Sequence, residues 1–384
     1  MEFDLSETQQ LFKRSARELF ARECPPAVVR EMIENGKPYS HHVWGKLVEQ
    51  GWTGLIFSED DGGMGLGMVE MAVAFEEMGY ALLPGAFLST VPLAGSLIAK
   101  AGNEGQRKKY LDAIIEGRAK ATLALLEESG NWNPDSVMLA ATESSGRLTL
   151  DGKKLFVSDA GIADLIIIAA RAESGLVLAI VERGATAIKA MPSIDATRDL
   201  FEVTLDNVVV AEADVLARGT VAGAGLAHAL DVAALALAAE MVGGMQWILD
   251  ATVEYAKTRK QFGKPIGQFQ AVQHHCADML LAAESARSAV YYAAWVMGSE
   301  ASQAALAVSI AKAYASDSFR EVGNRGIQVH GGLGFTWDEN IHFYYKRAKA
   351  AELMFGDATF HRERIASLVI DQAAERAVAK PAIS

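Results

Sequence analysis

Four basic side chains gather between residues 257 and 264 of a chain whose overall charge is acidic: Lys257, Arg259, Lys260 and Lys264. The stretch 259–267 reads RKQFGKPIG and joins two segments that both have the apolar pattern of long helices. Arginine offers a planar fork of donors that suits a diphosphate. A solvated helix end whose lysines face the helix dipole would show the same charges. The charges alone leave both interpretations open.

A second stretch, residues 326–335, reads GIQVHGGLGF and follows another helical segment. The adjacent glycines Gly331 and Gly332 allow a ligand to approach the backbone closely, because neither carries a Cβ. His330 precedes them and is a candidate for contact with the same ligand. A simple helix stop would explain two glycines equally well.

The composition excludes several classes of protein. The 384 residues are 51% apolar and 22% charged, as is ordinary for a globular chain, and the formal net charge is −12. That sign argues against a general nucleic-acid binder and against a protein held on anionic lipid. The two cysteines and the His274-His275 pair have no partners at metal-ligand spacing, so we expect no metal site.

The longest uncharged stretch near the N-terminus, residues 81–99, contains Pro84, Pro92, Gly85 and Gly95. These residues favour a buried, broken segment over a membrane-spanning helix. The acidic N-terminus has no signal-peptide pattern, so we expect a cytoplasmic protein without a membrane anchor.

The pattern changes twice along the chain. Residues 1–118 indicate helices, the first opened by a capping box of Ser6 and Gln9. Residues 119–219 indicate short strands, including a hairpin with a type I′ turn at Asp151-Gly152. Residues 220–384 are again helical, with a long helix lightly broken at Gly243-Gly244. We therefore expect three domains, mainly α with a β domain that is a small barrel or sandwich.

Taken together and in this order, the motifs resemble the acyl-CoA dehydrogenase family over nearly the whole chain. The resembling segments are residues 44–51 and 58–65 in the first third, 121–127 and 151–158 in the middle, and the two stretches that begin at Arg259 and Gly326. The resemblance implies an N-terminal helical domain, a β domain and a C-terminal four-helix bundle. It also implies FAD as cofactor and a tetramer or dimer built through the bundle.

In that family FAD bridges subunits, and the resemblance assigns its binding residues here. The residues implied to hold the diphosphate and adenosine of a neighbour's FAD are Arg259, Gln261, Phe262, Gln270, Gln328, Gly331 and Gly332. On the flavin-ring side, Phe156 stands where the family has tryptophan and Ser158 where it has threonine. Leu126 replaces a threonine that hydrogen-bonds the ring, and leucine cannot donate.

The catalytic base of the family is missing at both of its usual positions. Removal of the α-proton of the substrate needs a carboxylate within hydrogen-bond reach. Phe355 occupies the position before a glycine in the last loop, and Ala233 the alternative position on the first bundle helix. Glu240 lies seven residues after Ala233, about 10 Å along a helix. Glu240 and Asp357 are the weak candidates for a substitute base, although a buried acid paired within the bundle is the favoured interpretation of Glu240.

These observations leave three functional hypotheses. The favoured one is a base-lacking subunit of a heteromeric FAD-dependent acyl-CoA dehydrogenase, built with a paralogous chain, of the kind that often acts on bulky, steroid-like acyl-CoAs. The second is a homotetrameric acyl-CoA dehydrogenase with a displaced catalytic acid. Other flavin chemistry on the same fold is a remote third. Both enzymes would pass electrons to an electron-transfer flavoprotein, and the sequence does not fix the length or shape of the acyl chain.

Overall fold

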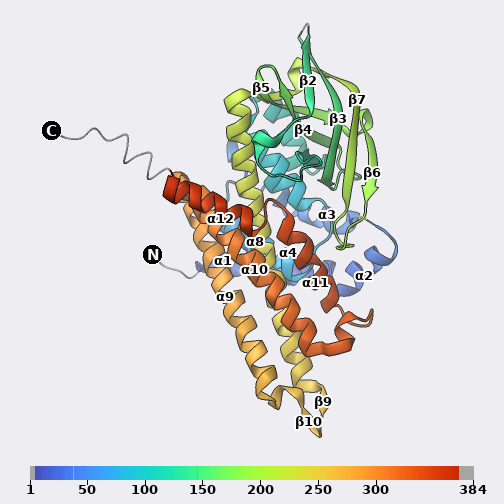
Figure 1. Ribbon diagram of the computed structural model, residues 1–384, viewed down its shortest axis with the longest axis vertical. Helices are drawn as coiled ribbons and strands as arrows, with labels where there is room; N and C mark the ends of the chain where they lie inside the picture. Colours follow the sequence, from blue (N-terminus) through green and yellow to red (C-terminus); the bar gives the residue numbers. More distant parts are fainter. Residues whose placement is uncertain (1–4, 38, 145, 372–384) are drawn as a thin grey trace, which may run out of the picture. The chain divides into compact units, whose positions relative to one another are not determined.

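The computed structural model describes residues 5–37, 39–144 and 146–371, and it combines many helices with one large sheet (Figure 1). The chain separates into two compact units. The first unit comprises Met1–Ala74 and Ala81–Ala236, and the second Phe75–Tyr80 and Leu237–Ser384. The predicted mainly α fold with a β domain is confirmed, whereas the boundaries at 118/119 and 219/220 stay a prediction.

The N-terminal part of the first unit is helical, as predicted. Helix α1 (Glu7–Glu23) opens with the expected capping box, in which Ser6 and Gln9 exchange side-chain to backbone hydrogen bonds. Pro25 follows the end of α1, and Pro26 begins the next helix, because proline fits the first helical position. The helices that follow are α2 (Pro26–Glu34), α3 (His41–Glu49), α4 (Met68–Tyr80), α5 (Ser96–Ala101), α6 (Glu104–Gln106) and α7 (Asp112–Ile115).

The uncharged segment before α5 is buried and irregular, as predicted. All residues of the π-helical turn Ser89–Gly95 are buried, and Pro92 lies inside this turn. Proline cannot donate to the helical ladder, so a regular helix is disfavoured here. A Cβ on Gly95 would lie 2.5 Å from Cζ of Phe57, which explains the need for glycine at this contact.

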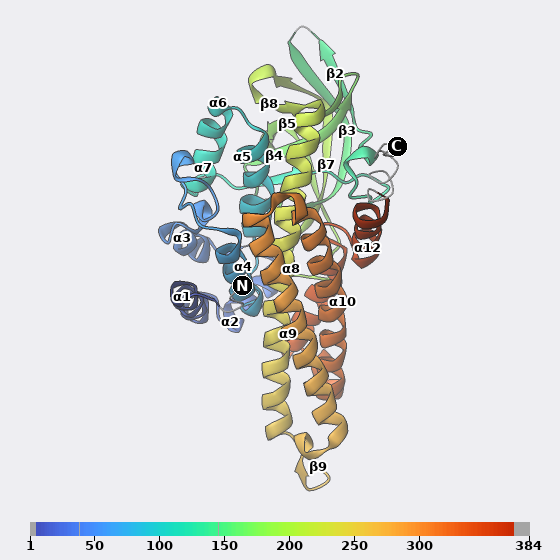
Figure 2. The same ribbon diagram turned by 90° about the vertical axis from the view of Figure 1, so that its left-hand side faces the viewer.

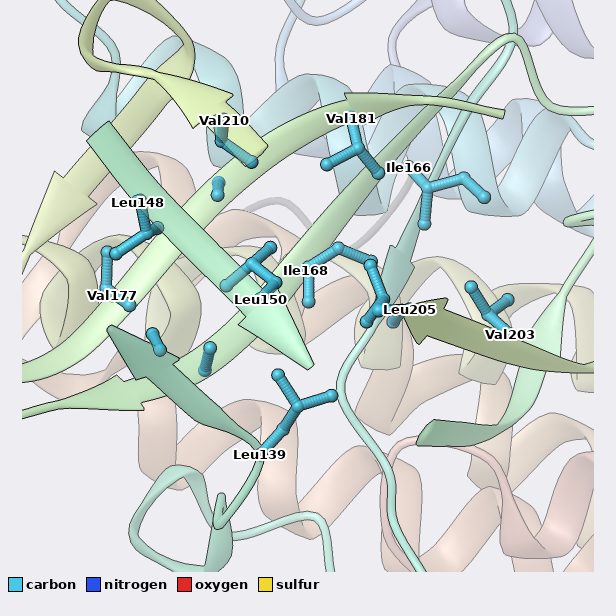
Figure 3. Close-up of a cluster of buried hydrophobic side chains, with 14 of the residues drawn as sticks. Leu139, Leu148, Leu150, Ile166, Ile168, Val177, Val181, Val203, Leu205 and Val210 are labelled. Atoms are coloured by element: carbon cyan, nitrogen blue, oxygen red, sulfur yellow. The ribbon is translucent and has the colours of Figure 1, made fainter. Parts of the chain in front are cut away.

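The strands form one eight-stranded sheet in the order β6-β7-β3-β2-β4-β5-β8, with β1 paired in parallel to β4. The strands are β1 (Ala121–Ala124), β2 (Ala140–Ser144), β3 (Arg147–Ser158), β4 (Leu165–Ala172), β5 (Gly175–Glu182), β6 (Ala187–Met191), β7 (Leu200–Ala211) and β8 (Val215–Arg218). Side chains from β3, β4, β5 and β7 point toward one another and enclose an aliphatic core (Figure 3). Strands β2 and β6 are short and mostly exposed, so neither contains the alternation of buried and exposed residues typical of a half-buried strand.

The predicted hairpin turn at Asp151-Gly152 is wrong. Strand β3 continues through both residues and pairs with β7 on one side, and up to Asp151 with β2 on the other. The register with β7 shifts between Leu150 and Gly152, and Gly152 has φ +134°. An Asp-Gly pair can serve a β-bulge as well as a turn, because both need a residue that tolerates unusual backbone angles. A bulge is what this strand contains.

The second unit is built on long helices that run side by side in both views (Figures 1 and 2). They are the later part of α8 (Gly219–Thr258), then α9 (Gln270–Ser299) and α10 (Ala304–His330), followed by the shorter α11 (Ile341–Leu353) and α12 (Ala358–Ala366). The expected light break at Gly243-Gly244 is wrong, because α8 runs through both glycines without interruption. A Cβ on Gly243 would lie 1.8 Å from the carbonyl oxygen of Glu76, so these glycines serve close packing.

Helix α8 is long and apolar enough to cross a membrane by length and composition alone. However, 67% of its most apolar window is buried inside the structure. Its apolar side chains therefore contact protein, as expected of the core helix of a packed domain.

Candidate functional site

The basic stretch forms the end of the bundle beyond α8. The backbone N–H of Arg259 donates to the carbonyl of Tyr255, and the chain then turns through the two-stranded hairpin of β9 (Lys260–Gln261) and β10 (Lys264–Pro265). Phe262 lies at the turn with φ +53° and is 90% exposed. Its ring contacts that of Phe269 edge to face, and the large exposed area that is left is suited to a partner or ligand.

Helix α9 starts directly after this hairpin, at Gln270. No side chain caps its first turn among the described residues, since Phe269 occupies the cap position. The N-terminus of a helix of this length offers free N–H groups and partial positive charge to an anion. Gln270 is exposed and adds an amide to the same place.

The end of α10 lies beside the end of α8. The ring of His330 stacks on that of Tyr255 with centroids 4.3 Å apart. This contact brings the basic stretch 259–267 and the glycine-rich stretch 326–335 to the same end of the bundle. Burial lowers the pKa of His330, so its ring is neutral and packs as an aromatic group. Gln328 is exposed on the last turn of α10.

The two glycines after α10 leave the backbone accessible. Gly331 has φ +63°, and a Cβ on either Gly331 or Gly332 would meet no atom within 4 Å. The open backbone, the guanidinium of Arg259 and the amides of Gln261, Gln270 and Gln328 form a donor set that fits an anionic diphosphate. The assignment of these residues to FAD stays a prediction that this geometry supports.

The residues predicted to face the flavin ring, Phe156 and Ser158, lie in the first unit at the end of β3. Phe156 has φ +54° and is 42% exposed, so the bulge of the strand turns an aromatic ring outward. The carbonyl of Ser158 accepts a hydrogen bond of 2.7 Å from Thr122. Leu126 is buried and offers no donor. This half therefore keeps an aromatic surface and the Ser158 hydroxyl, but lacks the side-chain donor that the family resemblance leads one to expect at residue 126.

Sequence reasoning missed a buried ion pair next to this half. Nζ of Lys154 is buried, lies 2.6 Å from Glu127 and donates to the carbonyl of Leu125. Glu127 also accepts from the backbone N–H groups of Met138 and Leu139, which closes the loop between β1 and β2. Burial lowers the pKa of Lys154, opposed by the carboxylate. Both residues are structural groups of the loop.

The two positions that the family resemblance assigns to the catalytic base carry no acid. Ala233 is buried on α8, in the part of that helix that belongs to the first unit. Phe355 is buried in the second unit with φ +57°, in the turn between α11 and α12. Neither side chain can accept a proton.

Glu240, the first candidate for a substitute base, is paired. Its Oε1 lies 2.5 Å from the guanidinium of Arg347, and both side chains are buried. The interpretation of Glu240 as a buried acid paired in the bundle is confirmed. Arg347 on α11 had no role in the sequence analysis, and its separation of 107 residues from Glu240 leaves no local signal.

Asp357, the second candidate, caps a helix. Its Oδ1 accepts a hydrogen bond of 2.7 Å from the backbone N–H of Phe360, in the first turn of α12. An N-cap aspartate that bonds the third helical residue has a sufficient structural role. The nearby Lys312 is fully buried and was also missed; its Nζ donates to the carbonyl of Gly356.

No group of three or more His, Cys, Asp or Glu side chains that could hold a metal ion occurs in the part of the chain that the structure describes. The Nδ1 of His275 instead lies 3.1 Å from the guanidinium of Arg325.

Known proteins resemble this chain along its length. The acyl-CoA dehydrogenase N-terminal domain matches residues 6–118, and the C-terminal domain matches residues 224–370. The acyl-CoA dehydrogenase IpdE2 of Mycolicibacterium smegmatis is 31% identical, covering 92% of this chain and 96% of its own.

Two solved structures share the fold. The ChsE4-ChsE5 complex of Mycobacterium tuberculosis has a TM-score of 0.87 at 26% identity and covers 100% of both chains. The Tcur3481-Tcur3483 steroid ACAD has a TM-score of 0.86 at 28% identity and covers 96% of this chain and 99% of its own. The matched domains span the helical first third and the bundle that carries the glycine-rich and basic stretches. This chain belongs to the acyl-CoA dehydrogenase family, oxidoreductases that act on acyl-CoA thioesters.

Proposed function

We propose that this chain is the base-lacking subunit of a heteromeric, FAD-dependent acyl-CoA dehydrogenase that introduces an α,β double bond into an acyl-CoA. The observation that carries this proposal is an asymmetry. The residues that the resemblance assigns to the nucleotide are all present, whereas the two positions that it assigns to the base hold hydrocarbon side chains, Phe355 and Ala233.

In this proposal the chain binds the nucleotide end of an FAD whose flavin ring is bound mainly by the partner subunit. Arg259 provides a bidentate donor for the diphosphate, and Gln328 with Gly331 and Gly332 provides amide and backbone donors. Bound FAD would supply the hydride acceptor for the β-carbon of the substrate. The partner would supply the carboxylate that takes the α-proton.

The alternative of a homotetramer needs a displaced acid in this chain. Glu240 is engaged with Arg347, and its protonation would leave a buried guanidinium without that counter-charge. Asp357 caps α12. Both assignments make a free base at these positions unfavourable, which supports the heteromer over the homotetramer.

Two of the similar structures support the choice of partner, because each is named as a pair of different proteins, ChsE4-ChsE5 and Tcur3481-Tcur3483. One of them is described as a steroid enzyme, which supports a bulky, ring-bearing acyl group for this chain too. As further parts of the proposal, the assembly is a tetramer, its electron acceptor is an electron-transfer flavoprotein, and it works in the cytoplasm.

The test compares the chain alone with the chain co-expressed with a paralogue that has glutamate at either base position. Bound FAD per chain is measured from the visible absorbance of the flavin, and turnover from ferrocenium reduction with a panel of acyl-CoAs. For the chain alone we expect low flavin occupancy and no turnover. For the co-purified complex we expect bound FAD and turnover of an acyl-CoA. Full occupancy with rapid turnover of the chain alone would refute the heteromer.

A further inference from the structure

Two buried donors hold successive carbonyl groups in the turn between α11 and α12. Nζ of Lys312, on α10, lies 2.9 Å from the carbonyl oxygen of Gly356 and 3.3 Å from that of Glu352. Nε2 of His361, on α12, lies 3.0 Å from the carbonyl oxygen of Phe355. A carbonyl can only accept, so this ring nitrogen carries the proton and donates.

The backbone that these donors hold is unusual. Phe355 has φ +57° and Gly356 has φ +94°, so two successive residues lie in the left-handed region. For phenylalanine that conformation is unfavourable, and it persists only where surrounding contacts impose it. A Cβ on Gly356 would lie 2.3 Å from a ring carbon of Phe360, which requires glycine there.

Both donors are enclosed by protein. Lys312 is 0% exposed, and its third contact is Oγ of Ser316 at 2.9 Å. The acids that act on it electrostatically are Asp357 and Glu352, whereas its Nζ donates to the Ser316 hydroxyl and to the carbonyls of Glu352 and Gly356. Burial lowers the pKa of His361 to about 3, so its ring is neutral and keeps one N–H for the carbonyl of Phe355.

We propose that Lys312 and His361 are positioning residues that fix this turn and thereby give the side chain of residue 355 one direction, whatever its chemical type. Each donor comes from a different helix and holds a different carbonyl, so together they determine both peptide planes after residue 355. The inference requires neither flavin nor partner subunit, and it goes beyond the proposed function. It assigns a role to two buried ionisable groups that the proposed chemistry does not use.

The test places a thiol at the position and measures its access to solvent. Phe355→Cys is made in a Cys276→Ser background, because Cys276 is half-buried and Cys24 is buried. Alkylation by iodoacetamide is followed by mass spectrometry. We expect slow alkylation, and an increase of about tenfold or more with Lys312→Met or His361→Leu, as local opening becomes more frequent.

Two control variants separate positioning from general loosening. His361→Gln keeps an N–H donor and should retain slow alkylation. Ser316→Ala removes the contact of Lys312 that does not belong to the turn, and should leave the rate within about twofold. Unchanged alkylation in both Lys312→Met and His361→Leu, in proteins with native circular dichroism, would overturn the proposal.

If those variants do not fold, hydrogen exchange of the unmodified chain decides the question. We expect the peptide 353–361 to be as protected as the peptide 341–350 of α11. Exchange of the turn at the rate of an unstructured peptide would show that the donors do not hold it.

Discussion

The guanidinium of Arg347 lies 2.5 Å from Oε1 of Glu240, joining α11 to α8 through two side chains that are 2% and 7% exposed. The ionised carboxylate of Glu240 balances the buried charge of Arg347. If it took a proton from a substrate, a buried cation would lose that charge partner in a medium of low dielectric constant. The pairing with Arg347 therefore argues, in physical terms, against Glu240 as a base in place of the residue at position 233.

Glu240→Gln should destabilise the protein strongly. The substitution leaves Arg347 charged and buried without this carboxylate, and breaking a buried pair costs about 3–5 kcal/mol. Urea unfolding followed by circular dichroism measures the loss. Glu254→Gln is the matched control, because Glu254 pairs with Lys257 on the same helix and both side chains are exposed. The control should change stability by less than about 0.5 kcal/mol, and equal effects of the two variants would contradict the assignment.

Asp357 should behave as a helix cap. Asp357→Ala removes the acceptor for the N–H of Phe360 and should cost about 1 kcal/mol of unfolding free energy. Asp357→Asn keeps an acceptor and should cost clearly less. In the proposed complex, both variants should turn over at the parental rate once folding is assured. A large loss of turnover in Asp357→Asn with normal stability would make Asp357 a base after all.

Local patterns predicted most of the helices of this fold, because capping residues and apolar periodicity act over a few residues. The capping box of Ser6 and Gln9 is an example. Asp151-Gly152 shows the limit of such signals. The same two residues suit a hairpin turn or a bulge, and only the pairing of β3 with β7 selects the bulge.

In the candidate site, too, some residues could be predicted from the sequence and others could not. The Arg259 and Gly331 stretches could be recognised from sequence because their donors lie close together along the chain. The pairs Glu240–Arg347 and Lys312–Gly356 could not, because their members are 107 and 44 residues apart. A lysine in an alanine-rich helix gives no sign that it will be enclosed. Its burial depends on where α11 and α12 pack.

Arg259→Ala should reduce the retention of FAD in the proposed complex. One bidentate, charge-assisted contact contributes about 1.5–3 kcal/mol, so the dissociation constant should rise by roughly 10- to 150-fold. Flavin remaining after gel filtration at low and high salt measures this. Arg183→Ala, at an exposed turn of the β domain, is the control. If both variants retain flavin equally, the diphosphate is bound elsewhere.

Leu126→Thr should raise flavin binding by the isolated chain. The substitution restores a hydroxyl where the family resemblance places a donor to the ring, and one neutral hydrogen bond contributes about 1 kcal/mol, or roughly fivefold in affinity. Leu125→Thr is the matched control, since Leu125 is equally buried in the neighbouring position. Flavin fluorescence quenching during titration measures both. A rise in neither variant would mean that residue 126 does not limit ring binding.

Lys312 should make the stability of the protein depend on pH near neutrality. Burial lowers its pKa to about 7 in the folded chain, from an ordinary value of 10.5. Between these two values the unfolded chain binds more protons, so the unfolding free energy should rise with pH, by at most about 1.4 kcal/mol per pH unit from this group. Below about pH 7 both states are protonated, and the contribution no longer changes.

The measurement is urea unfolding at several pH values from 6 to 10, with each variant compared with the unmodified chain. In Lys312→Met the rise above pH 7 that belongs to this residue should disappear, and the difference between the two proteins should vary with pH. Lys189→Met removes an exposed lysine and should give a difference that is constant over the same range. A constant difference for Lys312→Met as well would show that the ammonium group titrates normally and is not enclosed as the structure has it.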